Sequence, residues 1–378
     1  MTRFARPKLV VLKVGSSSLR GADGRLDRGQ VVNLAGQVVA ARRAGTDVVL
    51  VSSGAVAAGM GLLGLPQRPT DLPTLQAAAA VGQSELIQAY QRVLTDGGYT
   101  GAQILLSQDD FVRRGRYLNA RTTIQRLLAL GALPIINEND AITTKELAYG
   151  DNDHLAALVA SMLDAQLLVL LSDVDGLYDG DPSLGGAQLI RQVNNIDELD
   201  FDAIGGVGSV VGSGGMRTKV ESARVAVESS THAVVANTRR VDVLEDVLAG
   251  RDVGTWFVAH RQRIEARRLW IGFAMQVYGR IEVDQGAADA LRTRGVSLLS
   301  VGVVAAEGSF APGDAVEVID PDGRVIGRGL ANFDAADVNA IAGRSTTDAA
   351  VSHGPGYARE IIHRDDLVVF NGSRPGNR

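Results

Sequence analysis

Short apolar runs alternate with stretches of helical periodicity along the N-terminal two thirds of the chain. The runs have the composition and length of buried strands, and they cover Lys8–Val14, Asp47–Ser52, Ala102–Leu106, Leu133–Ile136, Leu167–Leu171 and Ala233–Ala236. Apolar residues recur at helical spacing over Gln30–Ala44, Leu75–Leu94, Thr122–Leu130, Asp153–Leu163 and Met216–Glu228. This alternation predicts an α/β domain with a mostly parallel sheet between layers of helices.

The pattern changes near Gly254–Trp270, an arginine-rich stretch without a clear period. From Val277 on, the segments are short and rich in turn residues, and an Asp-Gly turn joins the strands expected at Ala315–Ile319 and Val325–Leu330. A chain of 378 residues is also longer than one hydrophobic core usually supports. We expect an α/β domain at 1–258, a linker at 259–276, a small β-rich domain at 277–366 and a tail at 367–378.

Composition excludes several classes of protein. Hydrophobic residues make up 46% of the chain, but no apolar stretch reaches the ~20 residues of a membrane helix. Met1–Lys8 leads straight into a strand and lacks the apolar core of a signal peptide, so we expect a cytoplasmic protein. Without cysteine there is no disulfide framework, thiolate chemistry or zinc finger. A net charge of −5 gives no reason to expect nucleic acid as a partner.

Lysine is rare in this chain. Of 38 basic residues only four are lysine, namely Lys8, Lys13, Lys145 and Lys219. A general preference for arginine codons explains most of this bias. Lys13 and Lys219 nevertheless stand in glycine- and serine-rich segments, where a compact ammonium does what a planar guanidinium does less well.

Five segments of small, polar or acidic residues are candidates for one binding site, because ligands bind at the carboxyl ends of strands in an open parallel sheet. The first, Lys13–Ser17 (KVGSS), offers glycine and serine to a phosphate and a lysine to its oxygens, but it is no Walker A loop. Alone, such a lysine more often extends to solvent. The second, Ser52–Gly59 (SSGAVAAG), exposes N–H groups at a helix N-terminus or, equally, serves tight helix–sheet packing.

The remaining segments are acidic or glycine-rich. The third consists of two nearby loops, Asn137–Asp140 (NEND) and Gly150–Asp153 (GDND). Together they hold more acid and amide groups than turns and helix caps need, and such groups can bind an amino group. Ser172–Tyr178 opens from a buried strand into an acidic turn that suits a nucleotide, although Asp-Gly turns are common. In Gly212–Lys219 a glycine loop leads into a helix whose first turn carries a lysine. A positive charge at a helix N-terminus interacts unfavourably with the helix dipole, and a role in binding phosphate would explain why a lysine stands there.

Together these motifs resemble the amino acid kinase family, and most closely its glutamate 5-kinases. The resemblance rests, in chain order, on KVGSSSL, VSSGAVAAG, PIINENDA, GDNDHLAALVA, LLSDVDGLY and GSGGMRTKVESA. It extends over nearly the whole chain, because the C-terminal part resembles the PUA domain that bacterial members often carry. The resemblance implies the amino acid kinase fold, a mostly parallel sheet sandwiched by helices, followed by a β-rich PUA-like domain.

The resemblance also implies roles for individual residues. Lys13 would bind ATP phosphates, Lys219 would balance charge on the transferring phosphoryl group, and Asp153 would orient the two lysines. The residues implied to contact glutamate are Ser53, Asp140 and Asn152. Those implied to line the ATP site are Lys13, Gly15, Ser172, Asp173, Ser213, Gly214, Gly215, Met216, Arg217, Thr218 and Lys219. The family usually has threonine where Ser172 stands, and serine keeps the hydroxyl.

The implied reaction is phosphorylation of the side-chain carboxylate of L-glutamate by ATP, the first step of proline biosynthesis. That carboxylate, with a pKa of ~4.3, is already ionised at neutral pH, so no general base is needed. What is needed is in-line positioning and neutralised charge. We expect Mg²⁺ to be held largely by ATP oxygens and water, and we assign it no protein ligand.

The resemblance further implies feedback inhibition by proline near residues 139–152, a homodimer or homotetramer, and the next pathway enzyme as a candidate partner. Acetylglutamate kinase, aspartokinase and uridylate kinase share the glycine loops, but the paired NEND and GDND loops and the PUA-like segment favour glutamate 5-kinase. The chain has no room for the reductase of a bifunctional enzyme. RNA binding by the C-terminal segment is disfavoured, because from Val277 on it has ten arginines, no lysine and 14 acidic residues.

Overall fold

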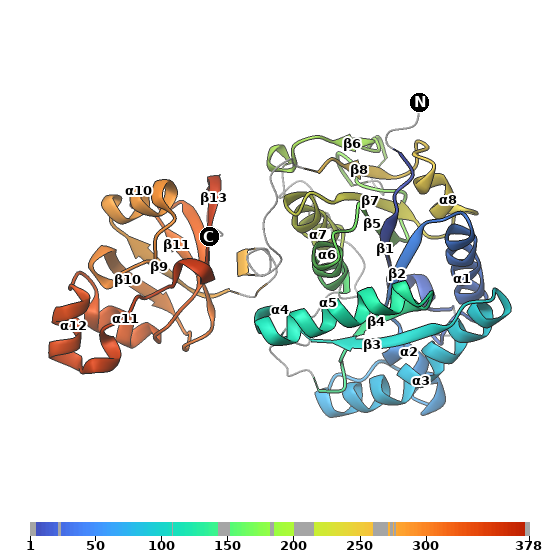
Figure 1. Cartoon of the computed structure of the whole chain (residues 1–378), viewed down its shortest axis with the longest axis horizontal. Coiled ribbons are helices and arrows are strands. Elements are labelled where there is room, and N and C mark those ends of the chain that lie inside the picture. The colour runs from blue at the N-terminus through green and yellow to red at the C-terminus, as the bar shows by residue number, and fades with distance from the viewer. Residues whose placement is uncertain are drawn as a thin grey trace. The chain divides into compact units, whose positions relative to one another are not determined.

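The computed structural model describes residues 5–21, 24–107, 109–142, 152–181, 185–199, 215–259, 271–272, 275 and 277–374. The chain divides into two compact units, Met1–Ala266 and Arg267–Arg378, each with its own sheet. Figure 1 shows the elements of both units.

The first unit is built on an eight-stranded sheet. Its strands, in spatial order, are β3 (Gly101–Leu106), β4 (Leu133–Glu138), β2 (Asp47–Ser52), β1 (Leu9–Val14), β5 (Leu167–Ser172), β7 (His232–Asn237), β8 (Thr255–Phe257) and β6 (Gln192–Val193). Strands β3 to β7 run parallel, and β8 is antiparallel to β7. The central strands are almost entirely buried and mostly apolar, as expected of parallel strands covered on both faces, and polar residues such as Lys13 and Ser172 stand near their carboxyl ends.

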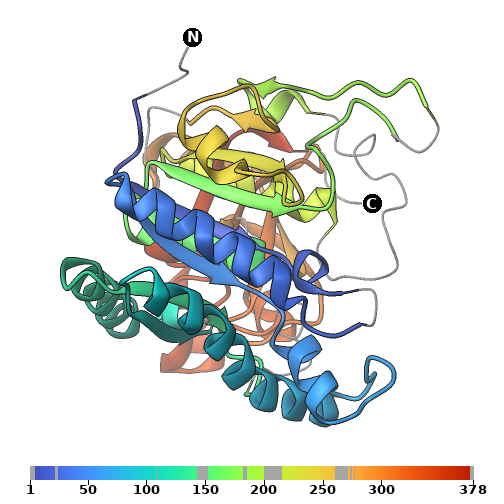
Figure 2. The same cartoon turned by 90° about the vertical axis from the view of Figure 1, so that its right-hand side faces the viewer.

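Helices cover both faces of this sheet, and the chain order decides which face each one takes. From β1 the chain moves outward to β3, and right-handed crossovers place α1 (Arg28–Arg43) and α3 (Leu72–Asp96) on one face. It then returns through β4 to β5 and β7, which places α5 (Arg114–Ala129), α6 (Asn152–Met162) and α7 (Met216–Glu228) on the other face. The short α8 (Val243–Leu248) joins the first face, where its leucines and valines share a core with α1 and α3. Figure 2 shows α1 and α3 side by side on this face.

The strand order reverses at β1. Strand β2 lies on one side of it, and β5, which follows the return of the chain, lies on the other. A reversal of this kind leaves a crevice outside the carboxyl ends of the adjoining strands, and that crevice is where open α/β sheets bind ligands. The topology therefore places a site beside the ends of β1, β2 and β5.

The short helix α2 (Ala55–Leu62), which follows β2, packs very closely against α3. A Cβ atom on Gly59 would lie 1.8 Å from the carbonyl oxygen of Ala78, and one on Gly82 would lie 1.8 Å from that of Ala55. Only glycine at these two positions allows the two backbones to meet. The small residues of Ser52–Gly59 therefore serve tight packing, but of helix on helix instead of helix on sheet.

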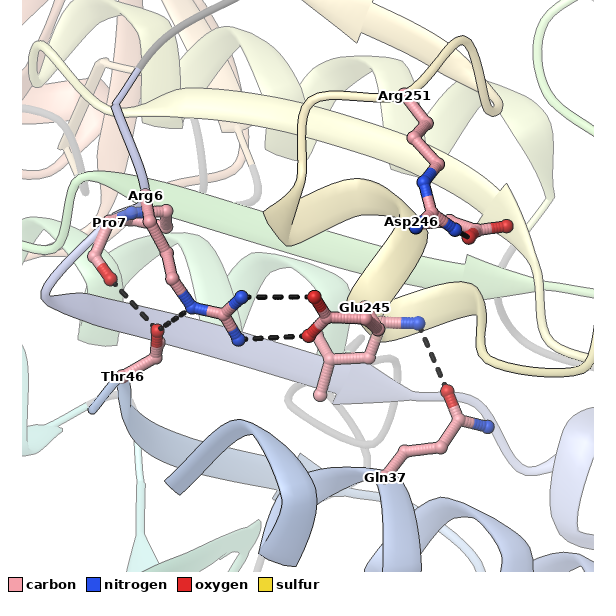
Figure 3. A network of polar contacts seen from close by, with 8 residues as sticks. Arg6, Pro7, Gln37, Thr46, Glu245, Asp246 and Arg251 are labelled. Atoms are coloured by element: carbon pink, nitrogen blue, oxygen red, sulfur yellow. Dashed lines mark hydrogen bonds and ion pairs between the residues drawn. The ribbon is translucent and has the colours of Figure 1, made fainter. Parts of the chain in front are cut away.

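Polar contacts attach the N-terminal segment to the same unit, as Figure 3 shows. The guanidinium of Arg6 donates two hydrogen bonds to the carboxylate of Glu245 on α8, at 3.0 and 2.9 Å, and its Nε donates to Thr46 Oγ1 at 3.1 Å. The Thr46 hydroxyl in turn donates to the carbonyl oxygen of Pro7. Both side chains are partly exposed to solvent, so we expect the pair to contribute less than about 1 kcal/mol.

The second unit contains a five-stranded sheet in the order β10 (Val303–Gly308), β9 (Val277–Val283), β11 (Ala315–Ile319), β12 (Val325–Leu330) and β13 (Leu367–Arg374). Strands β9 and β11 pair in parallel, and the other pairs are antiparallel. The α-helices in the described part of this unit include α10 (Gln285–Arg294), α11 (Ala335–Ile341) and α12 (Thr346–His353), and a side chain caps the N-terminus of each. Apolar side chains between the sheet and the helices form a separate core.

The structure corrects one detail of the sequence interpretation. Residues 367–378 were expected to form a tail, but β13 is the edge strand of the second sheet and pairs with β12, because its run Leu-Val-Val-Phe can cover the core. The stretch Gly254–Trp270, where the sequence pattern changes, begins within the first sheet. Trp256 of β8 is buried there, and a Cβ on Gly254 would lie 2.1 Å from the carbonyl oxygen of Val235.

Candidate functional site

The register of the strands aligns the carboxyl ends of β1, β2 and β5, where three of the candidate motifs begin. Val14 at the end of β1 pairs with Ser52 of β2 on one side and with Leu171 of β5 on the other. Gly15, Ser53 and Ser172 therefore leave the sheet next to one another. Four of the five motifs lie at strand ends, as expected. The fifth precedes α7, and of its loop the structure describes only Gly215 onward.

A lysine–aspartate–lysine cluster lies at this edge. The side chain of Lys13 projects from β1 toward α6, and Asp153 lies in the first turn of α6. Helix α7 packs beside α6 and carries Lys219 in its own first turn. Lys13 Nζ pairs with Asp153 Oδ1, and Lys219 Nζ donates to Asp153 Oδ2 at 3.2 Å. Exposed fractions of 3% for Lys13, 0% for Asp153 and 6% for Lys219 show that all three side chains are buried.

The electrostatics of this cluster favour an anion. Burial alone raises the pKa of Asp153, but the charges and hydrogen bonds of Lys13 and Lys219 outweigh burial and lower it. Asp153 is therefore ionised, and one negative charge faces two positive charges. Since buried charges are costly unless balanced, the surplus positive charge is available to a bound anion. The helix N-termini of α6 and α7 add partial positive charge at the same place.

An amide cluster lies beside the lysines. Asn152, the residue before Asp153, donates from Nδ2 to Ser53 Oγ at 2.9 Å and to Asn137 Oδ1 at 3.0 Å. Its own Oδ1 is buried and accepts no hydrogen bond in the part of the chain that the structure describes. Ser53 and Asn152, two of the three residues expected to contact glutamate, are thus in direct contact.

Asp140, the third of these residues, follows β4 and is half-buried. Burial raises the pKa of its carboxyl to about 6, and the charge of Arg68 partly opposes this shift. Within the described residues, no hydrogen bond joins Asp140 to Ser53 or Asn152. The structure therefore brings together two members of the expected trio and leaves the third without a direct link.

The residues expected to line a nucleotide site differ in exposure. Ser172 is buried at the end of β5, and its hydroxyl donates to Asp173 Oδ1 at 3.2 Å, while Asp173 is exposed. A Cβ on Gly15 would lie 3.4 Å from Lys13 Nζ, so Gly15 leaves the face of that ammonium open. Ser18 Oγ is buried and has no hydrogen-bond partner among the described residues, which leaves a hydroxyl near the same loop.

The described part of the fifth motif begins at Gly215, the N-cap of α7. Thr218 Oγ1 donates to the carbonyl oxygen of Gly215 at 2.8 Å, and exposed Arg217 pairs with Glu221 one turn along the helix. Met216 is half-buried. Ser213 and Gly214, like Gly150 and Asp151, lie outside the described residues.

Comparison with known proteins agrees with this arrangement. The model of the amino acid kinase family matches residues 8–237, which contain the cluster of Lys13, Asp153 and Lys219. The chain belongs to the amino acid kinase family. The PUA domain model matches residues 279–350, within the second unit. The expected fold, an amino acid kinase domain followed by a PUA domain, is confirmed.

Curated members of this family resemble the chain over almost its whole length. A glutamate 5-kinase of Frankia casuarinae is 49% identical, with 96% of each chain covered. A glutamate 5-kinase of Thermobifida fusca is 48% identical, covering 98% of this chain and 95% of the relative. A third, from Streptomyces coelicolor, is 47% identical over 96% of each chain. The resemblance to glutamate 5-kinases inferred from the motifs is thereby confirmed.

The sequence interpretation missed the residues behind the amide cluster of this amino acid kinase. Gln83 Oε1 accepts a hydrogen bond from Asn137 Nδ2 at 2.8 Å, and the hydroxyl of Tyr90 lies 2.9 Å from Ser52 Oγ. Both side chains come from α3, two turns apart. The sequence did contain a signal for Gln83, because it is a polar residue on the apolar face of a predicted helix. It shares that face with the buried Leu86 and Tyr90.

Among the described helices, none combines the length and the hydropathy that crossing a lipid bilayer requires.

Proposed function

We propose that this chain transfers the γ-phosphoryl group of ATP to the side-chain carboxylate of L-glutamate, giving L-glutamyl 5-phosphate, and that this is the first step of proline biosynthesis. The observation that carries the proposal is the buried carboxylate of Asp153, which holds the ammonium groups of Lys13 and Lys219 beside the amide cluster of Asn152. The names of the curated relatives support the same reaction.

In this proposal the two lysines have different roles in the transfer. Lys13, at the end of β1 next to Gly15, contacts oxygens of the ATP phosphates. Lys219, in the first turn of α7, contacts the γ-phosphoryl group while it is being transferred. Because Asp153 holds both, the charges are in place before the reaction begins, and no reorganisation is needed as negative charge shifts in the transition state. Ser172 and Asp173, with the loop Ser213–Lys219, would line the rest of the ATP site.

Glutamate recognition would fall to Ser53, Asn152 and Asp140. The α-ammonium of glutamate offers hydrogen-bond donors, and the buried Oδ1 of Asn152 is an acceptor that the protein leaves without a partner in its described part. Asp140, when ionised, supplies negative charge for the same ammonium. The α-carboxylate can accept from the hydroxyl of Ser53 or from backbone N–H groups at the start of α2.

The chemical step needs no general base. The side-chain carboxylate of glutamate, with a pKa of ~4.3, is already anionic at neutral pH. One of its oxygens attacks the γ-phosphorus, the bond from that phosphorus to the β,γ-bridging oxygen breaks, and ADP leaves with the electron pair. Both products are anions at neutral pH, so the step moves no proton.

Magnesium fits this site as a companion of ATP. Both oxygens of Asp153 face lysines, and no group of three or more His, Cys, Asp or Glu side chains with the geometry of a metal site occurs among the described residues. We propose that phosphate oxygens and water hold the ion, which supplies further neutralisation of the phosphate charges.

Regulation and assembly complete the proposal. L-Proline, as the end product, would inhibit at the glutamate site near residues 139–152, most of which lie outside the described part of the chain. The family resemblance supports a homodimer or homotetramer in the cytoplasm, with the next pathway enzyme as a candidate partner. The PUA domain would serve regulation or assembly, because its net negative charge does not favour RNA.

The test uses MgATP and hydroxylamine, which captures acyl phosphates as hydroxamates. Parallel reactions contain L-glutamate, N-acetyl-L-glutamate, L-aspartate or no acceptor, and both hydroxamate and ADP are measured. We expect hydroxamate with L-glutamate alone, in proportion to ADP, and a lower rate when L-proline is added. Folded protein that binds ATP but gives no hydroxamate with any of the carboxylates would overturn the proposed function.

A further inference from the structure

We propose that Gln83 is a positioning residue for glutamate binding, which acts through Asn137 to hold the Asn152 amide in place. This inference rests on the proposed function, because it concerns how the same site selects its substrate. None of the motifs that indicate the family contains Gln83, which lies in the middle of α3.

Three side-chain amides form a chain of hydrogen bonds that ends at the site. Gln83 Oε1 accepts from Asn137 Nδ2 at 2.8 Å. Asn137 Oδ1 accepts from the backbone N–H of Glu138 at 2.9 Å and from Asn152 Nδ2 at 3.0 Å. Asn152 Nδ2 also donates to Ser53 Oγ at 2.9 Å.

The polarity of this chain is held at Asn137 from two sides, by the backbone N–H of Glu138 and by Gln83. An amide group has one acceptor oxygen and one nitrogen with two donor hydrogens. The N–H of Glu138 requires the Asn137 oxygen on its side, and the oxygen of Gln83 accepts from the Asn137 nitrogen, so Asn137 turns its nitrogen toward α3 and its oxygen toward Asn152. Asn152 must then direct its nitrogen at Asn137 and Ser53, which uses both of its donor hydrogens. Its oxygen is left buried and without a partner within the described residues.

That oxygen needs a hydrogen-bond donor, since an unsatisfied buried acceptor is costly. L-Glutamate at neutral pH has a single kind of donor, its α-ammonium, because both of its carboxylates only accept. If the Asn152 amide were reversed, it would present N–H groups to the ammonium, and binding would be repelled. The direction of this one amide therefore distinguishes an amino acid from a plain dicarboxylate of the same length.

The packing of α3 explains why Gln83 can reach the site. The adjacent residue, Gly82, allows α3 to meet α2 at Ala55, where any side chain would collide with the carbonyl oxygen. Two turns later the buried Tyr90 contacts Ser52 Oγ at the end of β2. Helix α3 thus holds the ends of both β2 and β4 from one face, and Gln83 is half-buried between helix and strand.

The test compares two substitutions at this position. Gln83→Met keeps the length and unbranched shape of the side chain but removes the acceptor. The Asn137 nitrogen then loses its partner on α3, and Asn137 and Asn152 are held less firmly in place. We expect the KM for L-glutamate to rise about tenfold, with kcat and the KM for ATP within about twofold of the wild type. Gln83→Glu keeps an oxygen facing Asn137 Nδ2, and we expect its KM for L-glutamate to stay within about threefold.

A matched control lies on the same helix. Gln91 donates to Thr95 Oγ1 and accepts from the N–H of Gly101, both at 3.1 Å and both away from the amide cluster. Gln91→Met costs two hydrogen bonds where Gln83→Met costs one, so it reports how far lost stability alone changes the kinetics. We expect it to lower the unfolding midpoint and to leave the KM for L-glutamate unchanged.

A second substrate tests the assigned role directly. Glutarate lacks the ammonium, so we expect its kcat/KM to be the same in the wild type and in Gln83→Met, whereas that for L-glutamate falls. Equal loss for both substrates, or a KM for L-glutamate that Gln83→Met leaves unchanged, would overturn the inference. If Gln83→Met proved unstable, a rise in KM of tenfold or more in Gln83→Glu, where the acceptor remains, would overturn it as well. A wild type that forms no hydroxamate from L-glutamate would instead overturn the proposed function.

Discussion

Replacement of Asp153 by asparagine perturbs the site at its centre. The side chain keeps its size, but the negative charge between Lys13 and Lys219 disappears. Both ammonium groups remain buried, and each loses its ionised partner. Removing one member of a buried ion pair typically costs about 3–5 kcal/mol of stability, because the other charge stays buried without compensation. Asp153→Asn removes the shared partner of two such charges, so we expect a destabilisation at the upper end of that range.

The catalytic effect has a second origin. Without Asp153, the lysines repel each other and no longer hold the positions from which they face the phosphates. Loss of one preorganised charge-stabilising group commonly lowers kcat by about 10²–10³. Because two lysines depend on Asp153, we expect kcat to fall at least 10²-fold. The KM for L-glutamate should change less, since Asn152 still contacts Ser53 and Asn137.

The assay combines the rate of hydroxamate formation at saturating substrates with unfolding in urea. Asp164→Asn is the matched control, because Asp164 pairs with Arg121 at 2.9 Å at the surface, where both side chains are partly exposed. We expect that control to cost less than about 1 kcal/mol and to leave kcat unchanged. A folded Asp153→Asn protein with kcat within threefold of the wild type would refute the assigned role of Asp153.

Three further predictions concern other parts of the chain. Because burial raises the pKa of Asp140 to about 6, its carboxylate is ionised above that pH and neutral below it, so kcat/KM for L-glutamate should fall as the pH drops through about 6. Asp140→Asn should abolish this inflection, and its persistence in the variant would contradict the role of Asp140. Gly82→Ala places a Cβ 1.8 Å from the carbonyl oxygen of Ala55 and should lower the free energy of unfolding by about 3 kcal/mol or more. Gly36→Ala is the control, because Gly36 on α1 faces open space, and it should not lower the free energy of unfolding. Urea unfolding of the two variants checks this, and equal stabilities would refute the packing argument. Deletion of residues 277–378 should leave kcat largely intact, and a well-folded but inactive truncation would show that the PUA domain takes part in catalysis.

Sequence patterns predicted much of the first sheet and of the site. Strand β2 and helix α7 have the predicted bounds, and β11 and β12 do as well, because their apolar runs end sharply at turn or polar residues. The proximity of Lys13 and Ser53 followed from parallel topology alone, since the carboxyl ends of neighbouring strands must share an edge.

Tertiary packing decided the features that the sequence could not indicate. Helix α2 is short and made of small residues whose purpose shows only when Gly59 meets Ala78. Strand β8 has three residues, too few for a period. Helix α5 begins at Arg114, well before the predicted Thr122, because the polar residues at its start carry no apolar signal. The role of Gln83 depends on the direction of a hydrogen bond, which no pattern of residue types encodes.

The central claim is that a carboxylate oxygen of glutamate becomes bonded to phosphorus, and isotope transfer tests it most directly. L-Glutamate labelled with ¹⁸O in its side-chain carboxylate is incubated with the protein, MgATP and hydroxylamine, and the mass of the released phosphate is measured. Hydroxylamine attacks the acyl carbon, so the phosphate keeps the oxygen that joined it to glutamate. The account predicts one ¹⁸O atom in the phosphate for each hydroxamate formed. Unlabelled phosphate, released by attack of water on ATP, would contradict it.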